Sequence, residues 1–377
     1  MKTPFNKPYL SGNELKYIKK AVTLGKVSGN GFFTRKCHDF FRRTYGFNKA
    51  LLTTSCTSAL EMSALLINLQ PGDDVIVPSF SFVSDANAFT MRGANVVFVD
   101  SSAENPNADP VDIQKRITAR TRAILVVHYG GIACPMDEIM KIALKHNLFV
   151  IEDAAQAIDA RYKNKPLGSI GHLAAFSFHE TKNIISGEGG LLVVNDRRFE
   201  ERSEILWEKG TNRTAMLRGE VDKYEWMDIG SSYLPSEITA AFLFAQLEKL
   251  RSIQKKRIAI WDRYYNSLKH LEDHGQVELP RLPTYATNNG HLFYLMCRDK
   301  KERNALIREL KNSSICAIFH YLALHQSPFY RRFHEAQTLP NAERYANCLL
   351  RLPLYYTLQR QQQDAIIKAI KTFYRHQ

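Results

Sequence analysis

The sequence lacks the cysteine and histidine patterns that mark metal sites and disulfide frameworks. Its 377 residues include six cysteines and twelve histidines, but no C-x-x-C pair and no H-E-x-x-H motif. Scattered cysteines of this kind are typical of reduced thiols, because disulfides form mainly in oxidising compartments. We therefore expect free thiols, no structural metal and a cytoplasmic location.

Membrane and secretion signals are also missing. No stretch reaches the ~18 uninterrupted apolar residues of a membrane span. The N-terminal segment, residues 1–8, lacks the apolar core of a signal peptide. Apolar residues make up 45% of the chain and charged residues 24%, which is ordinary for a globular protein. These features predict a soluble protein with no membrane span.

Acidic residues are too few to balance the basic ones. The chain has 51 Lys and Arg against 38 Asp and Glu, a formal net charge of +13. Such an excess suits a nucleic acid or an anionic small molecule. The basic residues are spread along the chain, with no dense basic tail and no array interleaved with aromatics. We therefore expect no nucleic-acid partner, and an anionic small substrate stays open.

No G-x-G-x-x-G motif follows a predicted strand, which disfavours a dinucleotide-binding fold. Instead, strand-like and helical runs alternate over residues 50–200, a pattern that predicts an α/β layer with a mainly parallel sheet. A polar segment, 203–232, follows, and Ser236 begins a predicted long helix to about Leu271. We predict a large domain over residues 1–250 and a smaller C-terminal α+β domain over residues 251–377, which includes the long helix.

The stretch 176–190 is the most informative part of the chain. An apolar strand breaks there into a polar loop that carries Lys182, and glycines precede a second apolar strand at 191–194. A lysine held at a sheet edge can enter a cleft, where desolvation lowers its pKa and leaves a neutral amine able to attack a carbonyl. The alternative is an exposed loop lysine with no role.

A second candidate residue follows the apolar run 148–151, which predicts a buried parallel strand. Asp153 stands at the carboxyl end of that strand, where open α/β sheets bind ligands, and Gln156 follows it. A pyridoxal-phosphate (PLP) enzyme needs a Schiff-base lysine, a carboxylate for the pyridine nitrogen, an anion site for the phosphate and a flat face for the ring. Lys182 and Asp153 fit the first two needs. For Asp153, a helix N-cap is the alternative.

The phosphate and the ring also have candidate partners. A hydroxyl-rich turn leads into the predicted helix 59–67, and helix starts bind anions through free N–H groups; the alternative is an ordinary cap. Ser177 precedes the lysine and could donate a hydroxyl to the phosphate. Phe80 and Phe82 lie at a strand end, where either could stack on a ring or pack in the core.

Several motifs coincide in order along the chain: 54-TSCTSAL-60, 152-EDAAQ-156, 176-FSFHETKN-183, 187-GEGG-190 and 319-FHYLALH-325. Through them the chain resembles the DegT/DnrJ/EryC1/StrS family of sugar-nucleotide aminotransferases, which have the fold type I architecture of PLP enzymes. The resemblance spans nearly the whole chain. The stretches 208–213, 221–224 and 228–234 are most similar to the family's dTDP-4-amino-4,6-dideoxygalactose transaminase subgroup.

The resemblance implies a set of roles. Lys182 would form the Schiff base and shuttle the proton, Asp153 would pair with the pyridine nitrogen, and Gln156 would meet the ring hydroxyl. The remaining cofactor contacts that it implies are Ser177 and the N–H groups of Cys56 and Thr57 at the phosphate, and Phe82 on the ring. Family members that have lost the lysine are dehydratases, so Lys182 favours transamination.

Family active sites lie at a dimer interface, which implies a homodimer or larger assembly here. The partner chain usually contributes an Asn from an Asn-Tyr-Arg motif, and the matching segment here is Ser232-Tyr233-Leu234. This departure is shared by the most similar subgroup. We therefore expect Ser232 to contact the phosphate in place of the Asn.

We expect L-glutamate as amino donor, which leaves as 2-oxoglutarate, and dTDP-4-keto-6-deoxy-D-glucose as acceptor, aminated at C4, for surface-polysaccharide biosynthesis. Amination at C3 and a PLP-dependent sugar dehydratase are the alternatives. The axial or equatorial configuration and the thymidine or uridine nucleotide stay open. Candidate substrate contacts are Arg213, Arg218, Lys223, His320, Tyr321 and His325, and packing in the C-terminal domain is an equal alternative for the last three.

Overall fold

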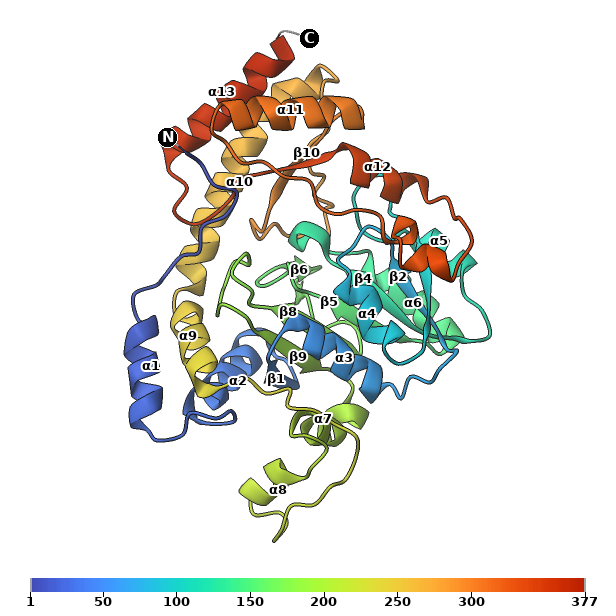
Figure 1. Ribbon diagram of the computed structural model, residues 1–377, viewed down its shortest axis with the longest axis vertical. Helices are drawn as coiled ribbons and strands as arrows, with labels where there is room; N and C mark the ends of the chain where they lie inside the picture. The colour runs from blue at the N-terminus through green and yellow to red at the C-terminus, as the bar shows by residue number, and fades with distance from the viewer. Residues whose placement is uncertain (1, 376–377) are drawn as a thin grey trace.

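A computed structural model describes residues 2–375 and places them in a large unit built on a central sheet and a smaller C-terminal unit, joined by a long helix (Figure 1). The seven-stranded sheet has the order β1-β9-β8-β5-β4-β2-β3. Only the pairs that β9 makes are antiparallel. The strands are β1 (Lys49–Thr53), β2 (Asp74–Pro78), β3 (Asn95–Val99), β4 (Thr121–Val127), β5 (Phe149–Asp153), β8 (Leu173–Ser177) and β9 (Gly190–Val194).

The sheet of the large unit is buried on both faces. Alternate residues of β5 enter different apolar cores, Val150 one and Ile151 the other, because successive side chains of a strand point to opposite faces. The helices and minor elements of this unit are α1 (Glu14–Thr23), α2 (Phe32–Tyr45), α3 (Cys56–Leu66), α4 (Ser84–Thr90), α5 (Pro110–Lys115), η1 (Tyr129–Gly131), α6 (Met136–His146), β6 (Arg161–Tyr162), β7 (Lys165–Pro166), η2 (Arg197–Phe199), α7 (Glu200–Trp207), α8 (Arg213–Leu217) and α9 (Glu237–Leu247).

The C-terminal unit packs helices on a two-stranded sheet around a third apolar core. Its elements are α10 (Leu250–Asp273), β10 (Phe293–Met296), α11 (Lys300–Asn312), η3 (Leu324–Gln326), η4 (Tyr330–Arg332), α12 (Pro340–Cys348), β11 (Leu349–Leu352) and α13 (Arg360–Arg375). Thr3 exchanges backbone hydrogen bonds with Ser314 and Cys316, so the N-terminal segment lies against this unit (Figure 1). The domain boundary at residue 250 stays a prediction.

The mainly parallel α/β fold is confirmed, but the long helix expected after the polar segment was wrong. The single helix expected from Ser236 to Leu271 is two helices, because Lys249 leaves helical geometry between α9 and α10 and no Gly or Pro marks the break. The polar segment 203–232 contains the end of α7 and the short helix α8. Ile315 and Ile318 make isolated bridges with Thr3 and Arg351.

Within residues 2–375, none of the helices has the length and apolar character needed to traverse a lipid bilayer.

Candidate active site

Lys182 lies in the loop between β8 and β9, at the edge of the central sheet. Two backbone hydrogen bonds close this loop, from Glu180 N–H to the Gly187 carbonyl (3.0 Å) and from Ser186 N–H to the Phe178 carbonyl (2.7 Å). Gly187 has a φ of +82°, a left-handed conformation that glycine adopts at little cost. Burial lowers the pKa of Lys182 below its ordinary value, although the nearby Asp153 carboxylate opposes the shift. The loop thus holds the amine in a buried position that disfavours its charged form.

Asp153 lies near this lysine, and Gln156 follows it after the end of β5. Asp153 ends β5, is nearly buried, and accepts a hydrogen bond from the Ala155 N–H at its Oδ1 (2.7 Å). Gln156 is fixed at both ends of its amide: Oε1 accepts from the Gly130 N–H (2.7 Å), and Nε2 donates to the Tyr321 hydroxyl (3.1 Å). The carboxylate and the amide are therefore held in place before any ligand binds.

A cradle for an anion forms where α3 begins. Ser55 caps the helix by accepting from the Ser58 N–H (3.0 Å). In the sheet, Gly190 pairs with Ser177, and a Cβ on Gly190 would come within 2.3 Å of the Ser55 backbone and 2.5 Å of the Cys56 nitrogen. Only glycine permits this approach, which brings Ser177 close to the free N–H groups of the helix start, those of Cys56 and Thr57.

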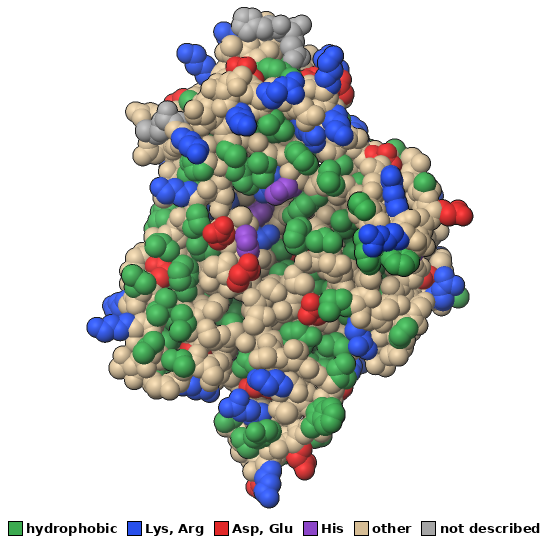
Figure 2. Space-filling model, in the orientation of Figure 1, with side chains coloured by type: hydrophobic (Ala, Val, Ile, Leu, Met, Phe, Trp, Pro, Cys, Tyr) green, Lys and Arg blue, Asp and Glu red, His purple; other side chains and the backbone are tan. Residues whose placement is uncertain are grey.

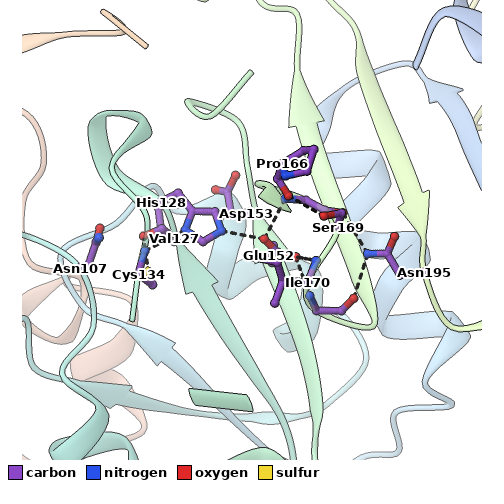
Figure 3. A network of polar contacts seen from close by, with 12 residues as sticks. Asn107, Val127, His128, Cys134, Glu152, Asp153, Pro166, Ser169, Ile170 and Asn195 are labelled. Atoms are coloured by element: carbon purple, nitrogen blue, oxygen red, sulfur yellow. Dashed lines mark hydrogen bonds and ion pairs between the residues drawn. The ribbon is translucent and has the colours of Figure 1, made fainter. Parts of the chain in front are cut away.

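The other face of β5 is anchored by a buried polar network (Figure 3). Glu152 accepts hydrogen bonds from the N–H groups of Gly168, Ile170 and Gly171, at 2.8, 2.8 and 2.6 Å. Its Oε2 also lies 2.9 Å from His128 Nε2. Since the Cys134 N–H donates to His128 Nδ1 (3.2 Å), that nitrogen carries no proton and Nε2 is the donor to Glu152. The network fixes the end of β5, so the adjacent Asp153 points to the opposite face.

We expect Glu152→Gln to destabilise the protein by about 3 kcal/mol, because it removes the acceptor that satisfies several buried donors. Burial alone would raise the pKa of Glu152, but hydrogen bonds from His128 and the backbone hold it below the ordinary value. Its contribution to stability is therefore present above the unfolded-state pKa of about 4.3 and is lost as the pH falls through the folded value. Urea unfolding between pH 3 and 7 measures both effects.

The exposed Glu138→Gln on α6 is the control and should leave the urea midpoint unchanged. Equal midpoints for wild type and Glu152→Gln across this pH range would contradict the role of the Glu152 network.

Two charged residues that sequence reasoning missed also face the site. Arg351 on β11 is only 8% exposed; its Nη1 lies 2.8 Å from His320 Nδ1, its Nε has no partner, and no carboxylate of residues 2–375 pairs with it. Asp85 on α4 is buried beside Asp153. A single charge inside an otherwise apolar or strand-end run, 349-LLRLP-353 and 79-SFSFVSDA-86, is the signal that could have found each.

The loop before η3 covers the site from the C-terminal unit. The Tyr321 ring lies 5.9 Å from the Phe82 ring, and Phe82 itself is 52% exposed. Burial and the neighbouring Arg351 lower the pKa of His320 to about 4. His325 is instead 2% exposed, with Nδ1 2.6 Å from Ser79 Oγ and Nε2 3.2 Å from Glu343. This environment favours the packing role for His325.

The remaining sequence candidates lie elsewhere in this chain. Helix α8 projects from the end of the large unit, away from the loop that carries Lys182 (Figure 1). Arg213 pairs with Glu208 (3.6 Å), and Arg218 pairs with Glu204 and Glu220 (2.8 and 2.6 Å). Lys223 and Ser232 are exposed. Within residues 2–375, no hydrogen bond or ion pair joins Arg213, Arg218 or Lys223 to the chain's own Lys182. Ser232 precedes Tyr233, whose carbonyl accepts from the Thr54 N–H (2.8 Å) just before α3.

The surface reflects this arrangement. Figure 2 shows histidine, carboxylate and cationic side chains gathered in a hollow in the middle of one face, with hydrophobic side chains around them. A crevice lined by residues of the N-terminal segment, the C-terminal unit and the 180–185 loop reaches Lys182.

These features fit PLP. The lysine amine, the strand-end carboxylate, the amide of Gln156 and the glycine-lined cradle would supply the Schiff-base, pyridine, ring-hydroxyl and phosphate partners that this cofactor needs. Fold and site together define a fold type I PLP enzyme.

A family model described as the DegT/DnrJ/EryC1/StrS aminotransferase family matches residues 8–371, and the chain belongs to this family. It is a PLP-dependent aminotransferase, as the sequence predicted. The chain is 32% identical to the spore coat polysaccharide biosynthesis protein SpsC of Bacillus subtilis over 383 residues, covering 98% of this chain and 96% of the relative.

Solved structures agree with this placement. The crystal structure of DesV from S. venezuelae is 30% identical, with a TM-score of 0.89 over 99% of this chain and 98% of the other. The aminotransferase TlmJ from Streptoalloteichus hindustanus is 27% identical, with a TM-score of 0.91 over 100% and 99% of the two chains.

Proposed function

We propose that the protein transfers an amino group from L-glutamate to C4 of dTDP-4-keto-6-deoxy-D-glucose, giving dTDP-4-amino-4,6-dideoxy-D-galactose for surface-polysaccharide synthesis. The observation that carries the transfer is the deprotonation-prone Lys182 beside Asp153. The similarity to a spore coat polysaccharide protein supports the sugar pathway. The nucleotide and the carbon rest on the subgroup resemblance of the segments 208–213, 221–224 and 228–234.

Each residue of the site has a separate role in the proposed reaction. When bound, PLP supplies an electron sink for the carbon that carries the amino group. Lys182 Nζ, whose pKa is lowered by burial, takes the proton from that carbon and later returns it. Asp153 holds the positive charge at the pyridine nitrogen, and Gln156 orients the ring through its fixed amide. Tyr321 narrows the entrance beside Phe82.

The donor carboxylate requires a cation, and Arg351 is suited to the task because its buried guanidinium keeps an unpaired Nε. We expect Arg351→Met to raise the KM for glutamate roughly tenfold to a hundredfold, the loss of one charged hydrogen bond. Cofactor affinity should stay within about twofold, since Arg351 serves the substrate. Half-reaction kinetics with glutamate alone measure this.

The exposed Arg308→Met on α11 is the matched control. An unchanged KM for glutamate with a raised KM for the sugar nucleotide would contradict this role and assign Arg351 to the acceptor instead.

We also infer that the active unit is a homodimer or larger assembly. The segment around α8 exposes large apolar side chains, among them Trp226 at 84% and Leu217 at 52%. A patch of this kind marks a protein contact. A partner would bring Ser232, Arg213, Arg218 and Lys223 to the site of the neighbouring chain. Sedimentation at working concentration tests this, and a fully active monomer would refute it.

One incubation tests the substrate. The enzyme is supplied with glutamate and either dTDP- or UDP-linked 4-keto-6-deoxy sugars, and NMR assigns the aminated carbon and its configuration. We expect an axial C4 amine on the dTDP sugar. A C3 amine, or turnover with the UDP sugar alone, would reject this substrate while leaving the aminotransferase assignment intact. Loss of water without an amine would indicate the dehydratase alternative.

A further inference from the structure

Two buried carboxyl groups meet beneath the Lys182 loop. Asp85, from the first turn of α4, is 1% exposed, and its carboxyl group lies beside that of Asp153. The start of α3 touches both segments: Thr57 Oγ1 lies 2.8 Å from Ser84 Oγ, and Cys56 Sγ lies 4.0 Å from Asp153 Oδ1. Two carboxylates cannot both be ionised at such a contact without strong repulsion in a site of low polarity. One of the pair therefore holds a proton, and the hydrogen bond between them passes through it.

The surrounding donors decide which of the two holds it. Asp153 Oδ1 accepts from the Ala155 backbone N–H (2.7 Å), a donor that cannot reverse, so this oxygen acts as an acceptor. Asp85 has no such donor. Its Oδ2 meets the Ser81 hydroxyl, and its Oδ1 has no partner of the donor kind in the described part of the chain. Asp85 Oδ1, which no donor among residues 2–375 faces, is therefore the oxygen suited to carry the proton and to donate it.

We propose that Asp85 is a protonated acid that donates a hydrogen bond to Asp153 and so keeps the Asp153 carboxylate ionised and oriented for the pyridine nitrogen of the cofactor. Asp85 is then a positioning residue, and it acts only through Asp153. The inference rests on the assignment of Asp153 as the partner of that nitrogen. Burial and the contact with Asp153 both raise the pKa of Asp85 well above its ordinary value, which agrees with a proton held there.

Besides Asp153, four groups face Asp85. They are the Ser81 hydroxyl before α4, the Cys56 thiol at the start of α3, the Lys182 amine and the Tyr321 hydroxyl. Burial raises the pKa values of the thiol and the phenol. Both stay neutral at physiological pH, so Lys182 is the one group among these neighbours that can carry a positive charge.

The sign of the pH dependence follows. Because the folded pKa of Asp85 lies above its unfolded value, the proton stabilises the fold at low pH and this contribution is lost as the pH rises through the folded pKa. Asp85→Asn keeps the geometry: its amide donates to Asp153 and its carbonyl oxygen accepts from Ser81, without a titrating proton. Asp85→Leu keeps the size and removes the donor.

The test compares PLP affinity, by fluorescence titration, and apoenzyme unfolding across pH 5–9 for four variants. We expect Asp85→Leu to weaken PLP binding roughly tenfold or more, the loss of a hydrogen bond to a charged group. Asp85→Asn should restore affinity to within about twofold of wild type and flatten the pH dependence of unfolding. Ser81→Ala, which removes a bond that favours ionised Asp85, should move the wild-type transition to higher pH.

Asp153→Asn separates the inference from the assignment beneath it. If Asp153→Asn leaves PLP affinity unchanged, the assignment of Asp153 as the partner of the pyridine nitrogen is wrong, and the inference fails with it. If Asp153→Asn weakens binding while Asp85→Asn binds PLP as poorly as Asp85→Leu, only the inference is overturned. Should Asp85→Leu fail to fold, the direction of the Ser81→Ala shift still decides, and a shift to lower pH or none would reject the proposal.

Discussion

Lys182→Ala should lose turnover by about 10⁴-fold or more, the scale of removing a group that acts as base and acid in one step. The residue also provides the covalent attachment for the cofactor, so the visible absorption of the lysine-bound form should vanish even where PLP still binds. The fold should survive, because the lysine side chain forms no hydrogen bond that closes its loop; those bonds are made by the backbone of residues 178–187.

The measurement is single-turnover kinetics with glutamate, with and without added methylamine. A small amine can enter the cavity left by the truncated side chain, so partial recovery of the rate is expected. Lys145→Ala is the control, an exposed lysine on α6 that faces solvent. Full turnover in Lys182→Ala would contradict the assignment of the catalytic lysine, and with it the mechanism.

Much of this site could be predicted because it is local in sequence. Lys182 and Ser177 flank one strand–loop junction, and Asp153 and Gln156 follow one strand end. Parallel strands bring such ends to the same edge of a sheet, so alternation of strands with helices is enough to bring these residues together. The cradle at Cys56 follows from the same rule, since it opens a helix after β1.

The missed residues depend on contacts between distant segments. Arg351 comes from the C-terminal unit, and Asp85 meets Asp153 across 68 positions of the chain, a pairing that no periodicity encodes. The break at Lys249 escaped notice for a different reason. Apolar spacing continues through it, so the change in direction is decided by packing rather than by a breaker residue. His325 shows the converse, since its polar partners Ser79 and Glu343 are invisible to the motif around it.

Asp153→Asn should weaken PLP binding roughly tenfold to a hundredfold, because the charged hydrogen bond to the pyridine nitrogen becomes a neutral one. Turnover should fall further, by about 10²-fold or more, since an unprotonated ring is a poorer electron sink and each 1.36 kcal/mol of lost stabilisation costs tenfold in rate. The fold itself should tolerate the change, because Oδ1 can still accept from the Ala155 N–H.

Stopped-flow measurement of the glutamate half-reaction, beside fluorescence titration of PLP, separates the two effects. Asp137→Asn is the matched control, an exposed aspartate whose pair with Lys163 lies in solvent and contributes little. The two losses also differ in what restores them. Excess PLP should recover occupancy in Asp153→Asn but not the rate, because saturation repairs binding and leaves the electronics of the ring unchanged. If Asp153→Asn regains full turnover at saturating PLP, Asp153 only anchors the cofactor. The role assigned to its charge in the chemistry would then be wrong.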